Sequence, residues 1–307
     1  MRKVIVGYDS REEASDALSL GQALAKADAA ELHVAVVLPR SHVPFEEAIA
    51  GGALSEQLDE RLFGRAERTL GSGEFTRASL DGGLGGRSAA RALYEYAEVQ
   101  DADLIVVGSS HRGKLGRILP GSVAESLLRG APCAVAVAPR GFAGREHAGF
   151  GVIGVAYDGS AEARLALAAG ESLSQTLAAE LKVITVAPMP SEFKAEFADA
   201  ERLAAELRRQ YRGILERGVA VLRDDTRAEA VLTQGDPGTV LGDLAADLDL
   251  LVVGSRGYGP VRSALLGAIS TAVIRSAPCP VLVVPRGAGS TDGSGRGAES
   301  GVGEQVG

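Results

Sequence analysis

The chain has 307 residues, which suits two domains of ordinary size better than one. Hydrophobic residues make up 46% of it, but aromatic residues only 4%, so the cores must consist of Leu, Val, Ala and Ile, as in parallel sheets that are buried on both faces. The formal net charge is −8, and no basic stripe with interleaved aromatic residues occurs, which disfavours nucleic-acid binding.

The N-terminal residues and the cysteines bear on the cellular compartment. The chain starts directly with a strand pattern, without the apolar segment of a signal peptide, and every apolar run is shorter than the ~18 residues that a membrane span needs. The two cysteines, Cys133 and Cys279, each follow Ala-Pro, and we interpret them as small buried hydrophobic residues rather than a disulfide framework. We therefore expect a cytoplasmic protein without a membrane partner.

The first half of the chain alternates strand-like and helix-like patterns. A strand-like run from Val4 ends at Asp9 and Ser10, and Ser10 followed by Glu13 has the spacing of a capping box, which predicts that a helix starts there. Further strands are predicted at 32–38, 74–80, 103–107 and 134–138, and further helices at 54–70, bounded by the Gly51-Gly52 pair, and at 88–100.

The second half repeats this order. A strand-like run from Val152 ends at Asp158, as the earlier run ends at Asp9, and a helix pattern follows over 165–173. Further strands are predicted at 181–186, 228–232, 250–253 and 281–284, further helices at 193–217 and 239–247, and a turn at 235–238.

The offsets between matching residues show that the two halves are one repeat. Asp158 follows Asp9 by 149 residues, whereas Gly254 follows Gly108, Gly267 follows Gly121 and Cys279 follows Cys133 by 146 residues each. One net deletion of three residues explains both values. We predict domains at 1–140 and 152–286, a linker at 141–151 and a disordered Gly- and Ser-rich tail at 287–307.

Strands that alternate with helices predict a doubly wound parallel sheet of five strands in each half. Such sheets bind ligands beyond the carboxyl ends of their strands, at the point where the strand order reverses. The residues that follow the first, second and fourth strands are therefore the candidates for a site.

The loop after the fourth strand of the second half has the spacing Gly254-x2-Gly257-x9-Gly267. Gly254 would let the chain leave the strand in a conformation that other residues resist. Gly257 and Gly267 would let backbone N–H groups approach a phosphate, and Gly267 stands where a helix begins, so that the helix dipole favours an anion there. Tight turns and close packing explain the same glycines, and the spacing alone leaves both interpretations open.

The matching loop of the first half reads Gly108-x2-His111-x9-Gly121-Ser122. The Ser122 hydroxyl could donate to a phosphate oxygen, or it could form a capping box with Glu125. Residues 108–114 also match the first seven positions of a P-loop, but Leu115 replaces the Ser or Thr that holds Mg²⁺, which argues against a true P-loop.

Asp9 and Asp158 end the first strand of each half. A carboxylate there could accept a hydrogen bond from a base amine or a ribose hydroxyl, or it could only start the following helix. No catalytic set accompanies these residues, because the four histidines lack metal-ligand spacing and neither a Gly-x-Ser-x-Gly elbow nor a Cys/His signature occurs.

Taken together, these motifs resemble the universal stress protein family. They are Val-x-x-Asp-x-Ser at the first strand, Asp-x-Asp-Leu-x-Val-Val-Gly at the fourth, the glycine spacing, and Ala-Pro-Cys-Pro-Val-x-Val-Val at the fifth. The resemblance covers nearly the whole chain. It implies two tandem domains of a nucleotide-binding α/β fold, paired through their fifth strands as an internal pseudo-dimer, with ATP binding in one branch of the family.

The resemblance also implies the residues that would contact ATP. In the first half these are Asp9, Val37, Gly108, His111, Gly121, Ser122 and Val123, and in the second half Asp158, Val186, Gly254, Arg256, Gly257, Gly267, Ala268 and Ser270. Two positions depart from the family pattern. Ala268 stands where the family has Ser or Thr, and His111 stands where it has glycine.

The leading hypothesis is an ATP-binding regulatory protein of the stress response that acts by binding nucleotide, with or without Mg²⁺, and that is compatible with a homo-oligomer. Two alternatives stay open. The first is a nucleotide-free interaction module of the same fold, which the departures at Ala268 and His111 favour, and the second is a slow ATPase.

Overall fold

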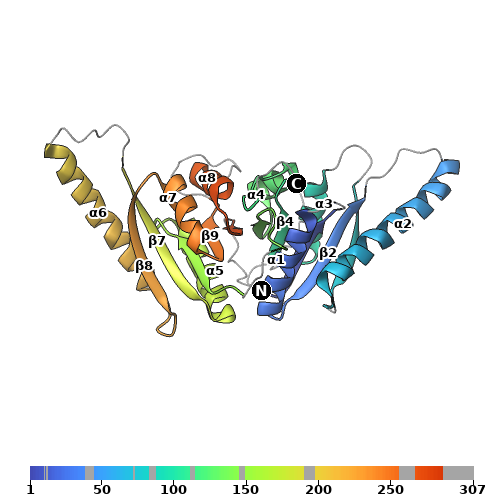
Figure 1. The fold of residues 1–307 in the computed structure, drawn as a ribbon, viewed down its shortest axis with the longest axis horizontal. Coiled ribbons are helices and arrows are strands. Elements are labelled where there is room, and N and C mark those ends of the chain that lie inside the picture. Colours follow the sequence, from blue (N-terminus) through green and yellow to red (C-terminus); the bar gives the residue numbers. More distant parts are fainter. Residues whose placement is uncertain are drawn as a thin grey trace, which may run out of the picture.

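The computed structural model describes residues 1–9, 11, 13–38, 45–71, 73–82, 88–110, 115–144, 149–189, 198–255 and 267–285. Within these ranges ten strands form one sheet in the order β3-β2-β1-β4-β5-β10-β9-β6-β7-β8, with helices on both faces (Figure 1). Each half supplies five parallel strands, so the predicted fold class is confirmed.

The first half follows the predicted order of elements. Its strands are β1 (Lys3–Tyr8), β2 (Glu31–Leu38), β3 (Thr76–Asp81), β4 (Leu104–Gly108) and β5 (Ala134–Ala138). Its helices are α1 (Glu13–Ala27), α2 (Phe45–Leu70), α3 (Ala89–Val99) and α4 (Ser122–Gly130).

The second half repeats that order. Its strands are β6 (Val152–Ala156), β7 (Glu180–Pro188), β8 (Ala228–Gly235), β9 (Leu250–Gly254) and β10 (Val281–Val284). Its helices are α5 (Ala161–Leu177), α6 (Ala198–Val219), α7 (Pro237–Leu244), the short 3-10 helix η1 (Ala245–Asp247) and α8 (Ala268–Ser276).

The two halves join through their fifth strands. β5 and β10 pair antiparallel, with Val135 opposite Val283 and Val137 opposite Val281, and all four side chains are buried. This is the internal pseudo-dimer that the resemblance implied. The long helices α2 and α6 lie at the two outer ends of the molecule (Figure 1).

Alternate residues of each strand face opposite sides of the sheet, which gives two cores. Val4 and Val6 of β1 belong to the core that also contains residues of α1, α2, α5 and α6, while Ile5 belongs to the core that contains residues of α3, α4, α7 and α8. Because both faces are covered, the central strands are apolar along their whole length, as parallel sheets require.

Two predicted boundaries are wrong. Helix α2 runs through Gly51 and Gly52, because a glycine inside a helix costs only about 1 kcal/mol relative to alanine and a long helix tolerates it. Helix α7 begins at Pro237, inside the predicted turn at 235–238, because Asp236 caps it and proline is favoured in the first helical turn. Ser10 and the predicted tail from 287 lie outside the described residues.

The chain between the halves is held against α1. Both carboxylate oxygens of the buried Asp16 accept backbone hydrogen bonds, from Gly141 and from Ala143, at 2.8 Å each. In the part of the chain that the structure describes, no helix is long and apolar enough to cross a membrane.

Candidate functional site

Two cavities lie at the carboxyl ends of the parallel strands, one in each half. They stand where the strand order reverses, between β1 and β4 and between β6 and β9. This is the place at which doubly wound sheets bind ligands, because the connections from neighbouring strands leave in opposite directions there.

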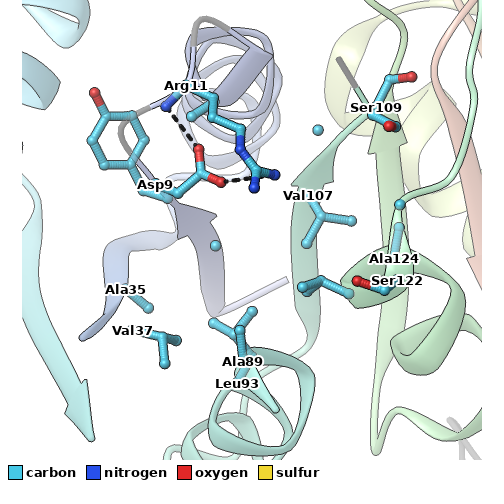
Figure 2. A pocket seen from close by; sticks show the side chains of 17 residues that line it. Asp9, Arg11, Ala35, Val37, Ala89, Leu93, Val107, Ser109, Ser122 and Ala124 are labelled. Atoms are coloured by element: carbon cyan, nitrogen blue, oxygen red, sulfur yellow. Dashed lines mark hydrogen bonds and ion pairs between the residues drawn. The ribbon is translucent and has the colours of Figure 1, made fainter. Parts of the chain in front are cut away.

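The first cavity has a volume of about 170 Å³ (Figure 2). The ends of β1, β2 and β4 form its walls together with the first turns of α3 and α4. It is lined by Gly7, Tyr8, Asp9, Arg11, Ala14, Ala35, Val37, Ala89, Leu93, Val107, Gly108, Ser109, Ser110, Gly121, Ser122, Val123 and Ala124.

The second cavity is larger, about 340 Å³, and is built from the matching elements together with α6. It is lined by Ala156, Tyr157, Asp158, Ala163, Ile184, Val186, Pro188, Tyr211, Asp236, Pro237, Leu241, Val253, Gly254, Ile269 and Ser270. Its polar lining includes two carboxylates, Asp158 and Asp236, whereas the described lining of the first cavity includes only Asp9.

Asp9 and Asp158 hold the turns that follow β1 and β6. Asp9 Oδ1 accepts a hydrogen bond from the backbone N–H of Arg11 at 2.9 Å, and Asp158 Oδ1 accepts one from Ser160 N–H at 2.9 Å. The N-cap of α5 is Ser160 rather than Asp158. Each carboxylate therefore has a structural role, and its two oxygens retain acceptor capacity on the cavity wall.

The residue two positions after each aspartate differs between the halves. In the first half it is Arg11, whose Nη1 lies 3.6 Å from Asp9 Oδ2. Figure 2 shows this guanidinium on the side of Asp9 that faces Val107, above the cavity. In the second half it is Ser160, whose hydroxyl oxygen accepts from Ala163 N–H at 3.1 Å. The first cavity thus has a cation where the second has a helix cap.

Helices α4 and α8 begin beside the cavities without a side-chain cap. Their N-caps are Gly121 and Gly267, and among the described residues no side chain caps the N–H groups of either first turn. Side chains of Ser88, Ser160 and Asp236, by contrast, cap α3, α5 and α7. The N-terminal N–H groups of α4 and α8, and the positive end of each helix dipole, are therefore suited to an anion.

The two N-cap glycines are not explained by backbone conformation. Gly121 has φ −80° and ψ 174°, and Gly267 has φ −62° and ψ 152°, values that any residue adopts. Among the described residues, a Cβ added to Gly121 would meet only Ser110 Cβ, at 3.9 Å, which is ordinary contact. Gly121 therefore leaves open space at the cavity wall that a side chain would fill.

Gly254 has a different reason to be glycine. Its φ is not positive, so the expected conformational role after β9 is wrong. A Cβ at this position would lie 2.9 Å from the carbonyl carbon of Glu162 and 3.0 Å from its carbonyl oxygen. Close packing of β9 against the start of α5 accounts for this glycine.

The serines of the two helix starts have different roles. Ser122 is the first residue of α4, one position after its N-cap, so the predicted capping box with Glu125 is wrong. The Ser122 side chain forms no hydrogen bond within the described part of the chain and lines the first cavity. The buried Ser270 hydroxyl instead donates to the Gly254 carbonyl at 2.9 Å and fixes the end of β9.

Most of the predicted site residues lie around the two cavities. Asp9, Val37, Gly108, Gly121, Ser122 and Val123 line the first, and Asp158, Val186, Gly254 and Ser270 line the second. Gly267 and Ala268 directly precede the lining residue Ile269 but do not belong to the lining. His111, Arg256 and Gly257 lie outside the described residues.

Sequence reasoning missed the walls that come from helices and the turn cation. Leu93 and Leu241 of α3 and α7 close the cavities from one face of the sheet, Tyr211 of α6 reaches the second cavity, and Arg11 lies at the first. The helical spacing of apolar residues in 88–100 was a usable signal for the α3 wall. Nothing local marks Tyr211, because its position depends on how α6 crosses the sheet.

The described residues offer little for catalysis. Within them, no group of three or more His, Cys, Asp or Glu side chains could hold a metal ion. Burial raises the pKa of Cys133 to about 12, so its thiol stays protonated at neutral pH, and Cys279 is also buried. The cysteines are therefore small core residues, as predicted.

Comparison with known proteins identifies relatives along the chain. The model of the universal stress protein family matches residues 1–139 and 149–285. Universal stress protein Rv2319c of Mycobacterium tuberculosis is 27% identical over 301 residues, 92% of this chain and 99% of that protein. Universal stress protein Rv2005c of the same organism is 34% identical over 195 residues, 60% of this chain but only 62% of that protein's own length.

A solved structure supports the fold. The crystal structure of a universal stress protein from Archaeoglobus fulgidus superposes with a TM-score of 0.63 at 20% sequence identity, covering 92% of this chain and 98% of that one. At this identity the likeness concerns the fold alone. The family model matches both halves separately, as the internal repeat requires.

Proposed function

Because the chain belongs to the universal stress protein family, we propose that it binds ATP in its two cavities and acts through this binding rather than through fast turnover. One duplicated observation carries the proposal. In each half, the first turn of a helix without a side-chain cap lines one cavity together with an aspartate from the end of the first strand.

The cavity walls suit the parts of an adenine nucleotide. Asp9 and Asp158 offer carboxylate oxygens to a ribose hydroxyl or a base amine, and Val37 and Val186 offer apolar contact to the base. The first-turn N–H groups of α4 and α8 suit phosphate oxygens, and in the first half the Ser122 hydroxyl adds a donor. The family resemblance adds Gly108, His111, Arg256, Gly257 and Ala268 to the set.

The glycine at the start of α4 supports a ligand at this point. Serine, aspartate and asparagine are better N-caps than glycine because they accept a backbone hydrogen bond. Glycine at position 121 has no side chain that could accept this bond, although its backbone conformation and its surroundings would accept a side chain. Close approach of a ligand to the backbone explains the residue.

Valine substitutions at the two N-caps test the proposal. Calorimetric titration of the native chain with ATP should give two sites of unequal affinity, because only the first lining has Arg11 and Ser122 and only the second has Asp236. Gly121→Val should abolish the first site and Gly267→Val the second, each leaving one site. Both backbones accept valine, so the thermal unfolding curves should stay close to that of the native chain.

Two results would contradict ATP binding here. The first is the absence of heat and of thermal stabilisation by ATP in the native chain. The second is an unchanged stoichiometry in both valine variants, which would place the nucleotide elsewhere.

The proposal of binding without fast turnover has its own test. Among the described lining residues, no general base stands beside a metal-holding carboxylate cluster. Phosphate release from ATP should therefore stay near background, with and without Mg²⁺. Release that depends on Mg²⁺ and is lost in Gly267→Val would favour the slow ATPase instead.

One residue favours a nucleotide-free interaction module as the second candidate. Ala268 begins α8 without the hydroxyl that Ser122 supplies at the start of α4, so the second half offers one hydrogen-bond donor fewer. Native mass spectrometry of the freshly purified chain distinguishes the two functions. Retained nucleotide contradicts the module, and a chain that neither retains nor binds nucleotide supports it.

A further inference from the structure

A third cavity, of about 480 Å³, lies between α5 and α6. It is on the face of the sheet opposite to α7 and α8, because Tyr157 and Ile214 in its wall belong to the core that α5 and α6 cover. It shares only Tyr157 and Asp158 with the second nucleotide cavity, since the turn after β6 separates the two. We call it the α5/α6 groove.

Two arginines line the α5/α6 groove from opposite helices. Arg164 of α5 donates one hydrogen bond, from Nη1 to the Gly159 carbonyl at 2.7 Å, and its other N–H groups have no partner in the described part of the chain. Arg217 of α6 forms no hydrogen bond or ion pair with any described residue. An arginine has five N–H donors, and both side chains are exposed, so most donors of this pair are accessible to a ligand from solvent.

The remaining polar lining also presents donors to the groove. Tyr157 is only 6% exposed, and its hydroxyl has no partner among the described residues. Asp158 is the single acid in the lining, and one of its oxygens already accepts from Ser160 N–H. The lining therefore has a net positive charge, and the donors outnumber the acceptors.

One wall of the groove is apolar. Ile214 lies at its base and is nearly buried, while Val221 is 70% exposed. A valine with this exposure beside two arginines offers an apolar contact next to a cationic one. Such a combination suits a ligand with an anionic head and an apolar body.

The first half also has two arginines near its matching tyrosine, Arg65 and Arg68 near Tyr8, but both belong to α2 and do not face each other from two helices. The residues that correspond to Tyr157 and Arg217 are Tyr8 and Arg68, but Ser15 stands in place of Arg164 and Arg65 in place of Ile214. Helices α1 and α2 also pack more closely on each other than α5 and α6 do. The opposed arginines with an apolar base occur only in the second of the two halves as described.

We infer that the α5/α6 groove binds a small organic oxyanion, with a phosphate, sulfonate or carboxylate held between Arg164 and Arg217 and an apolar body against Ile214 and Val221. Bidentate hydrogen bonds from guanidinium groups are the strong way to hold such oxyanions. The inference does not depend on ATP binding, because it rests on side chains on the other face of the sheet.

Phenyl phosphate is a suitable probe because it joins both chemical parts. Calorimetric titration of the full chain should give a saturable site that depends on Arg164 and Arg217, with tighter binding than either inorganic phosphate or phenol alone gives. Arg217→Ala and Arg164→Ser should each raise Kd at least tenfold. Two matched controls, Arg68→Ala at the corresponding place in the first half and Arg209→Ala on the same helix, should stay within twofold.

Further variants separate this groove from the nucleotide cavities. Gly121→Val and Gly267→Val should leave phenyl phosphate binding unchanged. Loss of binding in either valine variant, or an unchanged Kd in Arg217→Ala and Arg164→Ser, would overturn the inference. Binding of phenyl phosphate by a chain that does not bind ATP would refute the proposed function and leave the groove standing.

Discussion

At the scale of single residues, glycines of similar appearance in the sequence have different reasons to be glycine. Gly254 packs against the backbone of Glu162, whereas Gly121 has open space beside it. The sequence motif treats both as phosphate-loop glycines, Gly254 in the second half and Gly121 in the first. The structure assigns Gly254 to packing, and only Gly121 is compatible with the proposed contact to a ligand.

Alanine substitutions should separate these two roles. Gly254→Ala should lower the free energy of unfolding by about 1–3 kcal/mol, because its Cβ would force β9 and α5 apart. Gly121→Ala should lower it by less, about 0.5 kcal/mol, because only the N-cap preference for glycine over alanine is lost. Urea unfolding at pH 7 measures both, and equal losses would show that the contact with Glu162 is not decisive.

The residues of the site were predictable to different degrees. Asp9, Asp158 and the glycines follow directly after apolar strands, and position along the chain alone suggests them. Arg11 was not predicted because an exposed arginine in a turn has no local signature of a binding role. The competing roles of Ser122 could not be separated either, because they differ by one position in where the helix begins.

At the scale of elements, the caps distinguish the helices beside the cavities. Asp236 caps α7 by accepting hydrogen bonds from the Thr239 hydroxyl at 2.8 Å and its backbone N–H at 2.9 Å. These bonds lower the pKa of Asp236, with the bond from the Thr239 side chain as the first cause. Folding therefore favours the ionised carboxylate.

Removing this cap should lower the free energy of unfolding by an amount that depends on pH. Because the pKa of Asp236 is lowered in the folded state, its contribution is present above its unfolded pKa, ~3.9, and is lost as the pH falls through the folded value. Asp236→Ala should cost about 1 kcal/mol at pH 7. The difference in the free energy of unfolding between Asp236→Ala and the native chain should become smaller towards pH 3.

Ser88→Ala supplies the matched control for this loss. Ser88 caps α3 at the corresponding place through a hydroxyl that does not titrate. In urea unfolding, Ser88→Ala should lower the free energy of unfolding by the same amount at pH 7 and at pH 3. A loss for Asp236→Ala that does not vary with pH would show that the charge of the cap is unimportant.

The elements were largely predictable because strand and helix patterns in this chain are strong. The two wrong helix boundaries lie at glycine or proline, at Gly51-Gly52 and at 235–238. Both residue types interrupt helices in general, but α2 is long enough to contain the first pair and α7 uses Pro237 in its first turn. Tertiary context, which a local pattern does not contain, decided both.

At the scale of the whole molecule, one pair of strands joins the halves into a single sheet. Val135, Ala136 and Val137 of β5 are buried against β10 and the helices around it. Without the second half, β5 would become an exposed apolar edge with unpaired N–H and C=O groups. An isolated first half should therefore find another partner for this edge.

A fragment of residues 1–144 should associate as a homodimer through β5. Antiparallel pairing of two β5 strands would restore the bonds that β10 supplies in the full chain. Sedimentation at micromolar concentrations should show a dimer, and Ala136→Lys in the fragment should shift it to monomer because the buried edge then carries a charge. A folded fragment that stays monomeric would contradict this.

Repetition made the whole-molecule arrangement predictable only with help from the family resemblance. The offsets of 149 and 146 residues establish two copies of one unit, yet they do not say which edges of the copies meet. The partner edge follows from the resemblance alone. The α5/α6 groove was not foreseen, because it depends on the spacing between two helices that the sequence places far apart.

Because β5 and β10 join within one chain, the two candidate ligand sites always occur together. In a dimer of separate subunits, dilution would part the two sites, whereas here their ratio is one to one at every protein concentration. The two halves can also differ in sequence, as they do at Arg11 and Ser160. Each half pairs with the other half of the chain, and not with an identical copy of itself. If both cavities bind nucleotide as proposed, the chain has four ligation states, and the two states with one site filled are distinct species.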